Sequence, residues 1–369
     1  MARKHRRVGT SFHVHKTMVG DMKNLPEVKD TSLKNVNYLL AKIFARDGFE
    51  KGMNPFEVIS TPEFRRFTIE YDMADGGPAI FPESVALVDR MLKSKFNFQK
   101  SIDLTLPFES FVMSMPKGLV HDGDELMSVS VRQDHGIQAI SDIAREFGKS
   151  VKSIRDAEGV RYFHDEQLDM LIDDPYFSVP DEQRDMTYIS VMVEFAKDGA
   201  RKDPDFAEYR MRSDLLSLAL KSNKREDFIS LCKLYDEELS NTFKIDRAFT
   251  KERCGEMLYY GIKALASMSV YMALDGNKLK EGLPGKYIKD KYNLHMTGQN
   301  VSPFLLSSTP AIEREVVAKG AHYRQSHFRN LRDERFYRGE HADKEVGSRW
   351  VAVSDSLVNS MNDPSTLTM

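Results

Sequence analysis

Apolar residues recur along this chain with two different periods, and together the two periods restrict the fold to a mixed one. Over residues 126–131 apolar and polar residues alternate, which is typical of a half-buried β-strand. Over residues 33–46 apolar residues return every three to four positions, which is typical of an amphipathic helix. We therefore expect an α+β protein with antiparallel strands, a helical middle region and a C-terminal β-hairpin module.

The same patterns predict the order of the elements. Helical periodicity or a capping signal predicts helices over residues 33–46, 83–95, 137–147, 206–221, 225–239, 250–274 and 309–320. Alternation or β-branched content predicts strands over residues 64–71, 102–115, 126–131, 188–195, 322–329 and 348–353. We expect Gly148 to end the helix that begins at residue 137, and residues 121–124 to form a turn.

Charge is distributed unevenly and suggests how the chain is organised. Residues 1–16 hold five Lys or Arg and no Asp or Glu, and residues 321–350 hold seven Lys or Arg against five Asp or Glu. Because the net charge is −3, the rest of the chain is acidic, and the basic ends suggest an anionic partner. We expect a basic N-terminal arm over 1–30, an α+β domain over 31–200, a helical region over 201–300, a C-terminal module over 301–358 and a flexible tail over 359–369.

Several classes of protein are not indicated. Cys232 and Cys254 lie in apolar helical patterns without zinc or disulfide spacing, so they read as buried thiols of a reducing compartment. No apolar run reaches the roughly 18 residues of a membrane span. We expect a cytoplasmic protein of a bacterial host with no cofactor and no metal; His13 and His15 offer a metal pair without a third ligand.

The segment after Gly320 gathers imidazole, guanidinium and indole groups. Guanidinium forks match phosphate, and aromatic rings can stack on unpaired bases, so this composition favours an RNA-binding or partner-binding surface. In a helical segment, four of the arginines at a spacing of three would form one basic stripe. The predicted binding residues are His322, Arg324, His327, Arg329, Arg332, Arg335, Arg338, Arg349 and Trp350.

Other interpretations of this segment remain open. His322, His327 and Arg324, with Tyr337 as an additional acid, could serve a metal-independent ribonuclease, one group accepting the 2′-hydroxyl proton and another donating to the leaving oxygen. Trp350 could instead be a core residue. The neighbouring Asp and Glu residues could also neutralise the arginines. The protein would then be a protein-binding module without nucleic-acid contact, or a virion structural protein.

The pattern His322-x-Arg324-x-Ser326-His327-Phe328-Arg329, followed by Arg349-Trp350-Val351, resembles the C-terminal module of a family borne by phages and plasmids that includes a type V anti-CRISPR protein. In that family we expect glycine where Ser326 stands and tryptophan where Phe328 stands.

The stretch over residues 106–112 is similar to a Leu-Pro-x-x-x-aromatic strand of the same family. The resemblance implies interference with gene expression at the messenger or nascent-chain level, and no established catalytic residues. We therefore expect a protein of a phage or mobile element, and a binding protein rather than an enzyme. It would engage RNA or a ribonucleoprotein such as the ribosome, or a protein target, and lower expression of that target.

Overall fold

The computed structural model describes residues 12, 13, 15, 18, 33–71, 73, 77–97, 106–177, 179–197, 201, 204–213, 223–231, 252–272, 279–282, 302–306, 322–324, 327–353 and 356–358. Predicted features at residues 1–11, 232–251, 309–320 and 359–369, which include Cys232 and most of the basic arm, lie outside these ranges. None of the described helices combines the length and the apolar character that a membrane crossing requires.

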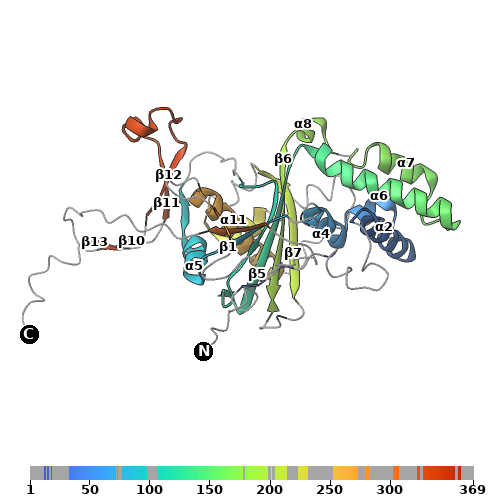
Figure 1. Ribbon diagram of the computed structural model, residues 1–369, viewed down its shortest axis with the longest axis horizontal. Helices are drawn as coiled ribbons and strands as arrows, with labels where there is room; N and C mark the ends of the chain where they lie inside the picture. Colours follow the sequence, from blue (N-terminus) through green and yellow to red (C-terminus); the bar gives the residue numbers. More distant parts are fainter. Residues whose placement is uncertain are drawn as a thin grey trace, which may run out of the picture.

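A mixed eight-stranded sheet forms the centre of the described structure (Figure 1). Its order is β7-β6-β5-β3-β1-β9-β8, and β4 pairs with β5. The strands are β1 (Pro78–Pro82), β3 (Ser110–Ser114), β4 (Val120–His121), β5 (Asp124–His135), β6 (Thr187–Ala196), β7 (Asp205–Arg212), β8 (Lys280–Glu281) and β9 (Ser302–Leu306). The α+β class is confirmed. The antiparallel arrangement is only partly right, because β1 runs parallel to both β3 and β9.

The longest antiparallel pairings of the sheet follow the alternation in the sequence. The strands predicted over residues 126–131 and 188–195 are confirmed as parts of β5 and β6, which pair along ten registered positions. The predicted turn before β5 is also present. Asp122 has φ 50° and Gly123 has φ 90°, the left-handed pair that a tight hairpin turn requires.

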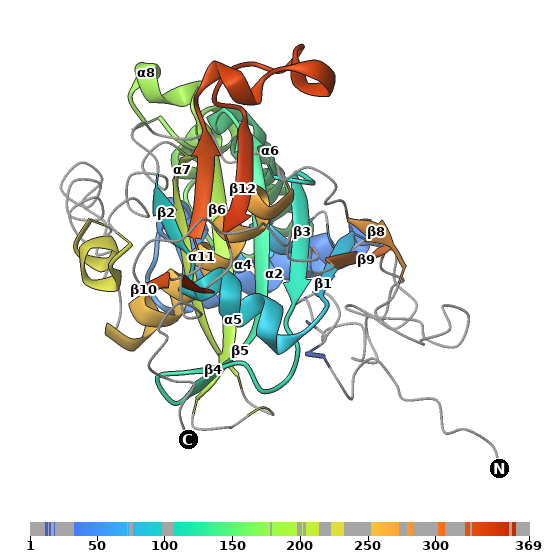
Figure 2. The same ribbon diagram turned by 90° about the vertical axis from the view of Figure 1, so that its left-hand side faces the viewer.

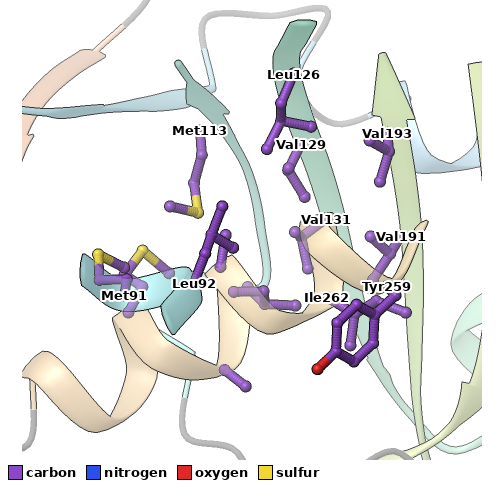
Figure 3. Close-up of a cluster of buried hydrophobic side chains, with 14 of the residues drawn as sticks. Met91, Leu92, Met113, Leu126, Val129, Val131, Val191, Val193, Tyr259 and Ile262 are labelled. Atoms are coloured by element: carbon purple, nitrogen blue, oxygen red, sulfur yellow. The ribbon is translucent and has the colours of Figure 1, made fainter. Parts of the chain in front are cut away.

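Two helices cover one face of the sheet and close the main hydrophobic core. These helices are α5 (Val85–Lys93) and α11 (Glu252–Met272), near the positions predicted from periodicity. Figure 3 shows Ile262 and Tyr259 of α11 beside Val129 and Val191 of the sheet. The helix lies close to the sheet at Gly261, where an added Cβ would come within 2.3 Å of Val193.

A second group of helices packs beyond the other face of the sheet and has a hydrophobic cluster of its own (Figure 1). The helices are α2 (Leu33–Glu50), α3 (Pro55–Ile59), α4 (Pro62–Glu70), α6 (Ile137–Glu158) and α7 (Asp165–Asp173). The short helix α8 (Asp181–Arg184) packs beside α6 and has no buried residue. Gly148 lies inside α6 rather than at its end. Its missing side chain admits α7, because an added Cβ would meet Ile172 at 3.0 Å and Leu171 at 3.3 Å.

The strand predicted over residues 64–71 is wrong, because this segment forms α4. Its aromatic and β-branched residues resemble those of a strand. However, the Thr61 side chain accepts a hydrogen bond from the backbone N–H of Phe64, and Pro62 occupies the first turn. A cap followed by proline is a helix start signal, and it outweighs the β-propensity of the residues that follow.

The helix predicted over residues 206–221 is also wrong where it can be compared, because residues 205–212 form β7. Ala207, Tyr209 and Met211 are buried at every second position beside α11. The period is therefore two, which favours a strand. The helix predicted from residue 225 is present over 225–231, where the described segment ends.

The C-terminal region forms two small sheets. Strand β11 (His327–Leu331) pairs antiparallel with β12 (Arg349–Val353) and parallel with β2 (Lys95–Asn97). Strand β10 (His322–Arg324) pairs with β13 (Ser356–Val358). The strand predicted over residues 322–329 is therefore divided between two sheets. The hairpin of β11 and β12 projects from the main body, and its loop contains the short turns η5 (Glu334–Phe336) and η6 (Gly339–His341) (Figure 2).

Candidate nucleic-acid interface

The three-stranded sheet β12-β11-β2 joins the C-terminal hairpin to a strand far away in sequence. Arg329 lies opposite Val351 on β12 and opposite Asn97 on β2. His327 lies opposite Lys95. The sheet thus brings a lysine of the first third of the chain next to the C-terminal module, which the sequence alone did not indicate.

Positive charge is concentrated on the strands of this sheet. The three strands contain Lys95, Arg329, Arg349 and His327 but no Asp or Glu. Lys95 and Arg329 are exposed, and Arg349 is half-buried. All five acidic residues of the hairpin lie in the loop over residues 332–348. The sheet is therefore basic, whereas the loop has mixed charge.

The predicted loop arginines differ in how they are engaged. Arg335 pairs with Asp333 at 3.4 Å and lies 4.7 Å from the centre of the Phe336 ring. Arg332 donates from Nε to Asn330 Oδ1 at 3.0 Å. Arg329 and Arg338 are exposed and have no ion pair with any residue that the structure describes. The acids of the loop therefore neutralise only part of the basic set.

Tyr337 organises the loop instead of facing a reaction centre. Its ring is buried, and its hydroxyl accepts hydrogen bonds from the backbone N–H of Gly347 at 2.7 Å and of Arg349 at 3.1 Å. The hydroxyl donates to the carbonyl of Leu331. Because its bonds all close the loop, this group is not placed to act as the general acid proposed from the sequence.

Trp350 packs into the main core. It is 7% exposed and belongs to the cluster that includes Ile262 of α11. A buried indole cannot stack on an unpaired base, so Trp350 has the core role that was the alternative interpretation from the sequence. It anchors β12 to the body of the protein.

The remaining predicted residues, His322, Arg324 and His327, have a described backbone only. His322 and Arg324 lie on β10, opposite Val358 and Ser356, whereas His327 lies on β11. They therefore do not lie on the single continuous strand that the sequence predicted over residues 322–329. Their side chains lie outside the described residues.

Two histidines that the sequence interpretation set aside form a buried polar network. His15 is fully buried and donates from Nε2 to Glu70 Oε1 at 2.8 Å and from Nδ1 to Glu194 Oε2 at 3.1 Å. Ser128 Oγ donates to the same Glu194 oxygen at 2.7 Å. His13 donates from Nε2 to Glu125 Oε1 at 2.9 Å. The network holds His13 and His15 against the sheet and α4.

The environment shifts the pKa of these groups in opposite directions. Burial alone would lower the pKa of His15, but hydrogen bonds to Glu194 and Glu70 outweigh burial and raise it to about 9. Burial dominates at His13 and lowers its pKa. His15 is therefore a buried imidazolium between two carboxylates, whereas His13 favours the neutral form.

Distance along the chain explains why this network was missed. The partners of His15 lie 55 and 179 positions away, and the partner of His13 lies 112 positions away. The available signal was the His13-Val14-His15 spacing, which on its own suggests no more than an adventitious metal pair without a third ligand. Within the described residues no group of three or more His, Cys, Asp or Glu side chains is arranged to hold a metal.

A cavity of about 760 Å³ opens where α2, α6 and α7 meet, at the end of the molecule remote from the hairpin (Figure 1). Phe49, Tyr162 and His164 are among its lining residues. Arg155, another lining residue, pairs with Asp165 at 2.6 Å. The cavity therefore has mixed charge and is separate from the basic sheet.

Comparison with known proteins found no match: no family model, no curated protein and no solved structure matches the chain. The resemblance noted in the C-terminal pattern therefore remains a prediction.

Proposed function

We propose that this protein binds RNA, alone or in a ribonucleoprotein, through the basic sheet β12-β11-β2. The observation that carries the proposal is the charge of the strands: Lys95, Arg329 and Arg349 are present, and no carboxylate is. Exposed ammonium and guanidinium groups without acidic neighbours on the same strands favour an anionic polymer.

The kind of recognition follows from which groups are exposed. Phosphate oxygens match the guanidinium of Arg329 and the ammonium of Lys95. The rings of Tyr337 and Trp350 are buried, so these two residues do not provide a stacking platform. We therefore propose contacts mainly to the RNA backbone, with weak sequence preference and strong salt dependence.

The biological consequence is part of the same proposal. The resemblance of the C-terminal pattern to a phage- and plasmid-borne family suggests that binding lowers expression of a target. A bound messenger or translation complex would be the point of action. A protein partner that contacts the acidic body without RNA is the alternative.

Binding of a fluorescently labelled single-stranded RNA to the full-length protein tests the proposal. Arg329→Gln should weaken binding severalfold, because it removes an exposed phosphate contact. Arg161→Gln is the matched control, since Arg161 is also exposed and has no ion pair with a described residue, but it lies at the far end of the molecule. Equal affinity of the wild type and Arg329→Gln would contradict the proposed interface.

The same sample distinguishes the ribonuclease alternative. Gel analysis of the labelled RNA, with and without chelator, reports cleavage separately from binding. Cleavage that survives chelator and is lost in His327→Ala would indicate a metal-independent nuclease. Intact RNA that is nevertheless retained supports a binding protein.

A further inference from the structure

Exposed apolar side chains are concentrated at the helical end of the molecule. Of the six large apolar side chains that are exposed among the described residues, four lie on α2, on α7 or in the segments next to α7: Phe49, Val160, Met170 and Phe177. Phe49 is 51% exposed and lies edge-on to Tyr162, with the ring centres 6.1 Å apart. Because exposed apolar groups cost free energy in water, such a concentration indicates a binding surface.

The cavity between α2, α6 and α7 is lined by the same exposed ring. Its volume of about 760 Å³ falls within the roughly 300–1,000 Å³ of ligand pockets. Phe49, Met53 and Tyr162 give it an apolar wall. Gly52 and Gly159 leave its backbone open, since a Cβ added at either would meet no atom within 4 Å. A bound chain can therefore reach both apolar side chains and backbone groups.

The polypeptide around the cavity is strongly acidic. Residues 152–185, which supply most of the lining, contain ten Asp or Glu against four Lys or Arg, a net charge of −6 with histidine neutral. This count includes the cations that pair with Asp165 and Asp169. The side chains of these two residues are nevertheless 72% and 53% exposed, and Glu166 is exposed too. The face therefore attracts cations and repels anionic polymers.

The lining of the cavity determines which part of a partner can enter it. Arg155 and Arg161 line it beside Asp156 and Asp165. A cationic side chain would meet two guanidinium groups there, and an anionic one would meet two carboxylates. A neutral apolar or aromatic side chain avoids both repulsions and gains contact with Phe49. The cavity therefore suits an apolar anchor, whereas the exposed carboxylates around it suit basic residues.

We infer that this face binds a basic segment of a partner protein, which seats one apolar or aromatic side chain in the cavity. The anchor packs against Phe49 and Tyr162. Lysine or arginine residues of the segment lie beside Asp165, Glu166 and Asp169. The anchor provides affinity, and the surrounding charges select basic partners and speed their encounter. The inference goes beyond the proposed function, because this face and the sheet β12-β11-β2 lie at opposite ends of the molecule (Figure 1).

Binding of a fluorescein-labelled amphipathic peptide of lysine and leucine to the full-length protein tests the inference. Phe49→Ala should weaken binding severalfold, because it removes the exposed ring that contacts the anchor. Glu166→Lys should also weaken binding severalfold, and more at low salt, because it reverses a charge beside the basic residues. Val346→Ala and Asp343→Lys are the matched controls, since both residues are exposed in the hairpin loop at the other end of the molecule. Affinities equal to those of the controls would overturn the inference.

Altered peptides and hydrogen exchange test the two parts of the recognition. Serine in place of leucine removes the anchor, and glutamate in place of lysine reverses the charge, so each change should weaken binding by about tenfold or more. The bound leucine peptide should slow hydrogen exchange over residues 159–167, which border the cavity, and not over residues 332–348. A serine peptide that binds as tightly as the leucine peptide, or the absence of this protection, would overturn the inference.

Two other occupants of this face would give different results. Residues 1–11 hold four Lys or Arg and no Asp or Glu, and their deletion should leave the peptide affinity unchanged. A higher affinity would identify this run as the occupant, and a dimer that Phe49→Ala abolishes would identify a second copy of the chain. Either result overturns the inference. Absent RNA binding counts against the proposed function, whereas absent peptide binding counts against this inference, so the two fail separately.

Discussion

At the scale of single residues, His13 and His15 carry opposite protonation preferences only two positions apart. Folding raises the pKa of His15 to about 9 and lowers that of His13. The difference arises from their partners. His15 lies between Glu70 and Glu194, whereas His13 bonds to Glu125, which the backbone N–H of Gly118 also contacts at 2.6 Å.

The raised pKa of His15 predicts a loss of stability on alkalinisation. Its contribution is complete below the unfolded value of about 6.5 and is lost as the pH rises through about 9. The shift corresponds to roughly 3 kcal/mol of unfolding free energy. Urea unfolding across this pH range, in the wild type and in His15→Gln, measures the contribution as the difference between the two curves.

That difference isolates His15 from other groups that titrate in the same pH range. The difference should be largest below about pH 6.5 and should shrink as the pH rises towards 9, because the variant has no imidazole to lose its proton. A difference that does not change with pH would contradict the buried imidazolium.

The lowered pKa of His13 predicts the reverse behaviour. Its contribution to stability is present above the unfolded value of about 6.5 and declines as the pH falls below it, since the folded state disfavours the charged form. His13→Gln should therefore lose stability less steeply than the wild type on acidification in urea unfolding. If the unfolding free energies of the wild type and of His13→Gln fall equally on acidification, then His13 does not titrate differently in the folded and unfolded states.

At the scale of elements, the close approach of α11 to the sheet depends on Gly261. An added Cβ would come within 2.3 Å of Val193. Gly261→Ala should therefore destabilise the protein by about 1–3 kcal/mol, although alanine favours helices. Chemical denaturation measures this effect.

A second substitution separates crowding from other causes. Val193→Ala opens space opposite Gly261, so the double variant should be less destabilised than the sum of the two single variants. Strict additivity would contradict steric crowding as the cause.

The hairpin loop depends on the hydroxyl of Tyr337. Tyr337→Phe leaves the backbone N–H groups of Gly347 and Arg349 without their acceptor. We expect hydrogen exchange at these two amides to accelerate by about tenfold or more, while amides of β5 and β6 remain protected. Unchanged exchange at both loop amides would contradict the organising role of Tyr337.

Local sequence patterns correctly predicted the helices and strands whose buried positions match their apolar residues. The alternation of β5 and the periodicity of α5 were sufficient. The cap at Thr61 and the proline after it identify α4, whereas the aromatic and β-branched residues of this segment alone favour a strand. In β7 the alternation of Ala207, Tyr209 and Met211 is present in the sequence and has the period of a strand, not the helical period on which the prediction was based.

The candidate interface was predictable only in part. Arg329 and Arg349 belong to a visible local pattern, and their strand pairing followed from it. Lys95 could not be found, because a parallel pairing between distant strands leaves no local signal in one sequence. The burial of Trp350 was likewise undecidable, since it depends on how α11 packs behind the hairpin.

At the scale of the whole molecule, the main sheet combines strands that lie between residues 78 and 306 of the chain. It takes strands from the regions expected to be the α+β domain, the helical region and the C-terminal module. His15 is bonded to the same sheet through Glu194. The basic sheet therefore projects from a body that distant segments stabilise, and the second helical cluster lies on the opposite side (Figure 1).

The salt dependence of RNA affinity tests the central claim most directly. For single-stranded RNA the logarithm of the association constant falls by about 0.7 per phosphate contact for each tenfold rise in salt, so three strand cations predict a slope of about −2. Removing Lys95 and Arg329 together, as Lys95→Gln with Arg329→Gln, should reduce the slope to about −0.7. A double variant that keeps the wild-type slope would contradict binding through the β12-β11-β2 sheet.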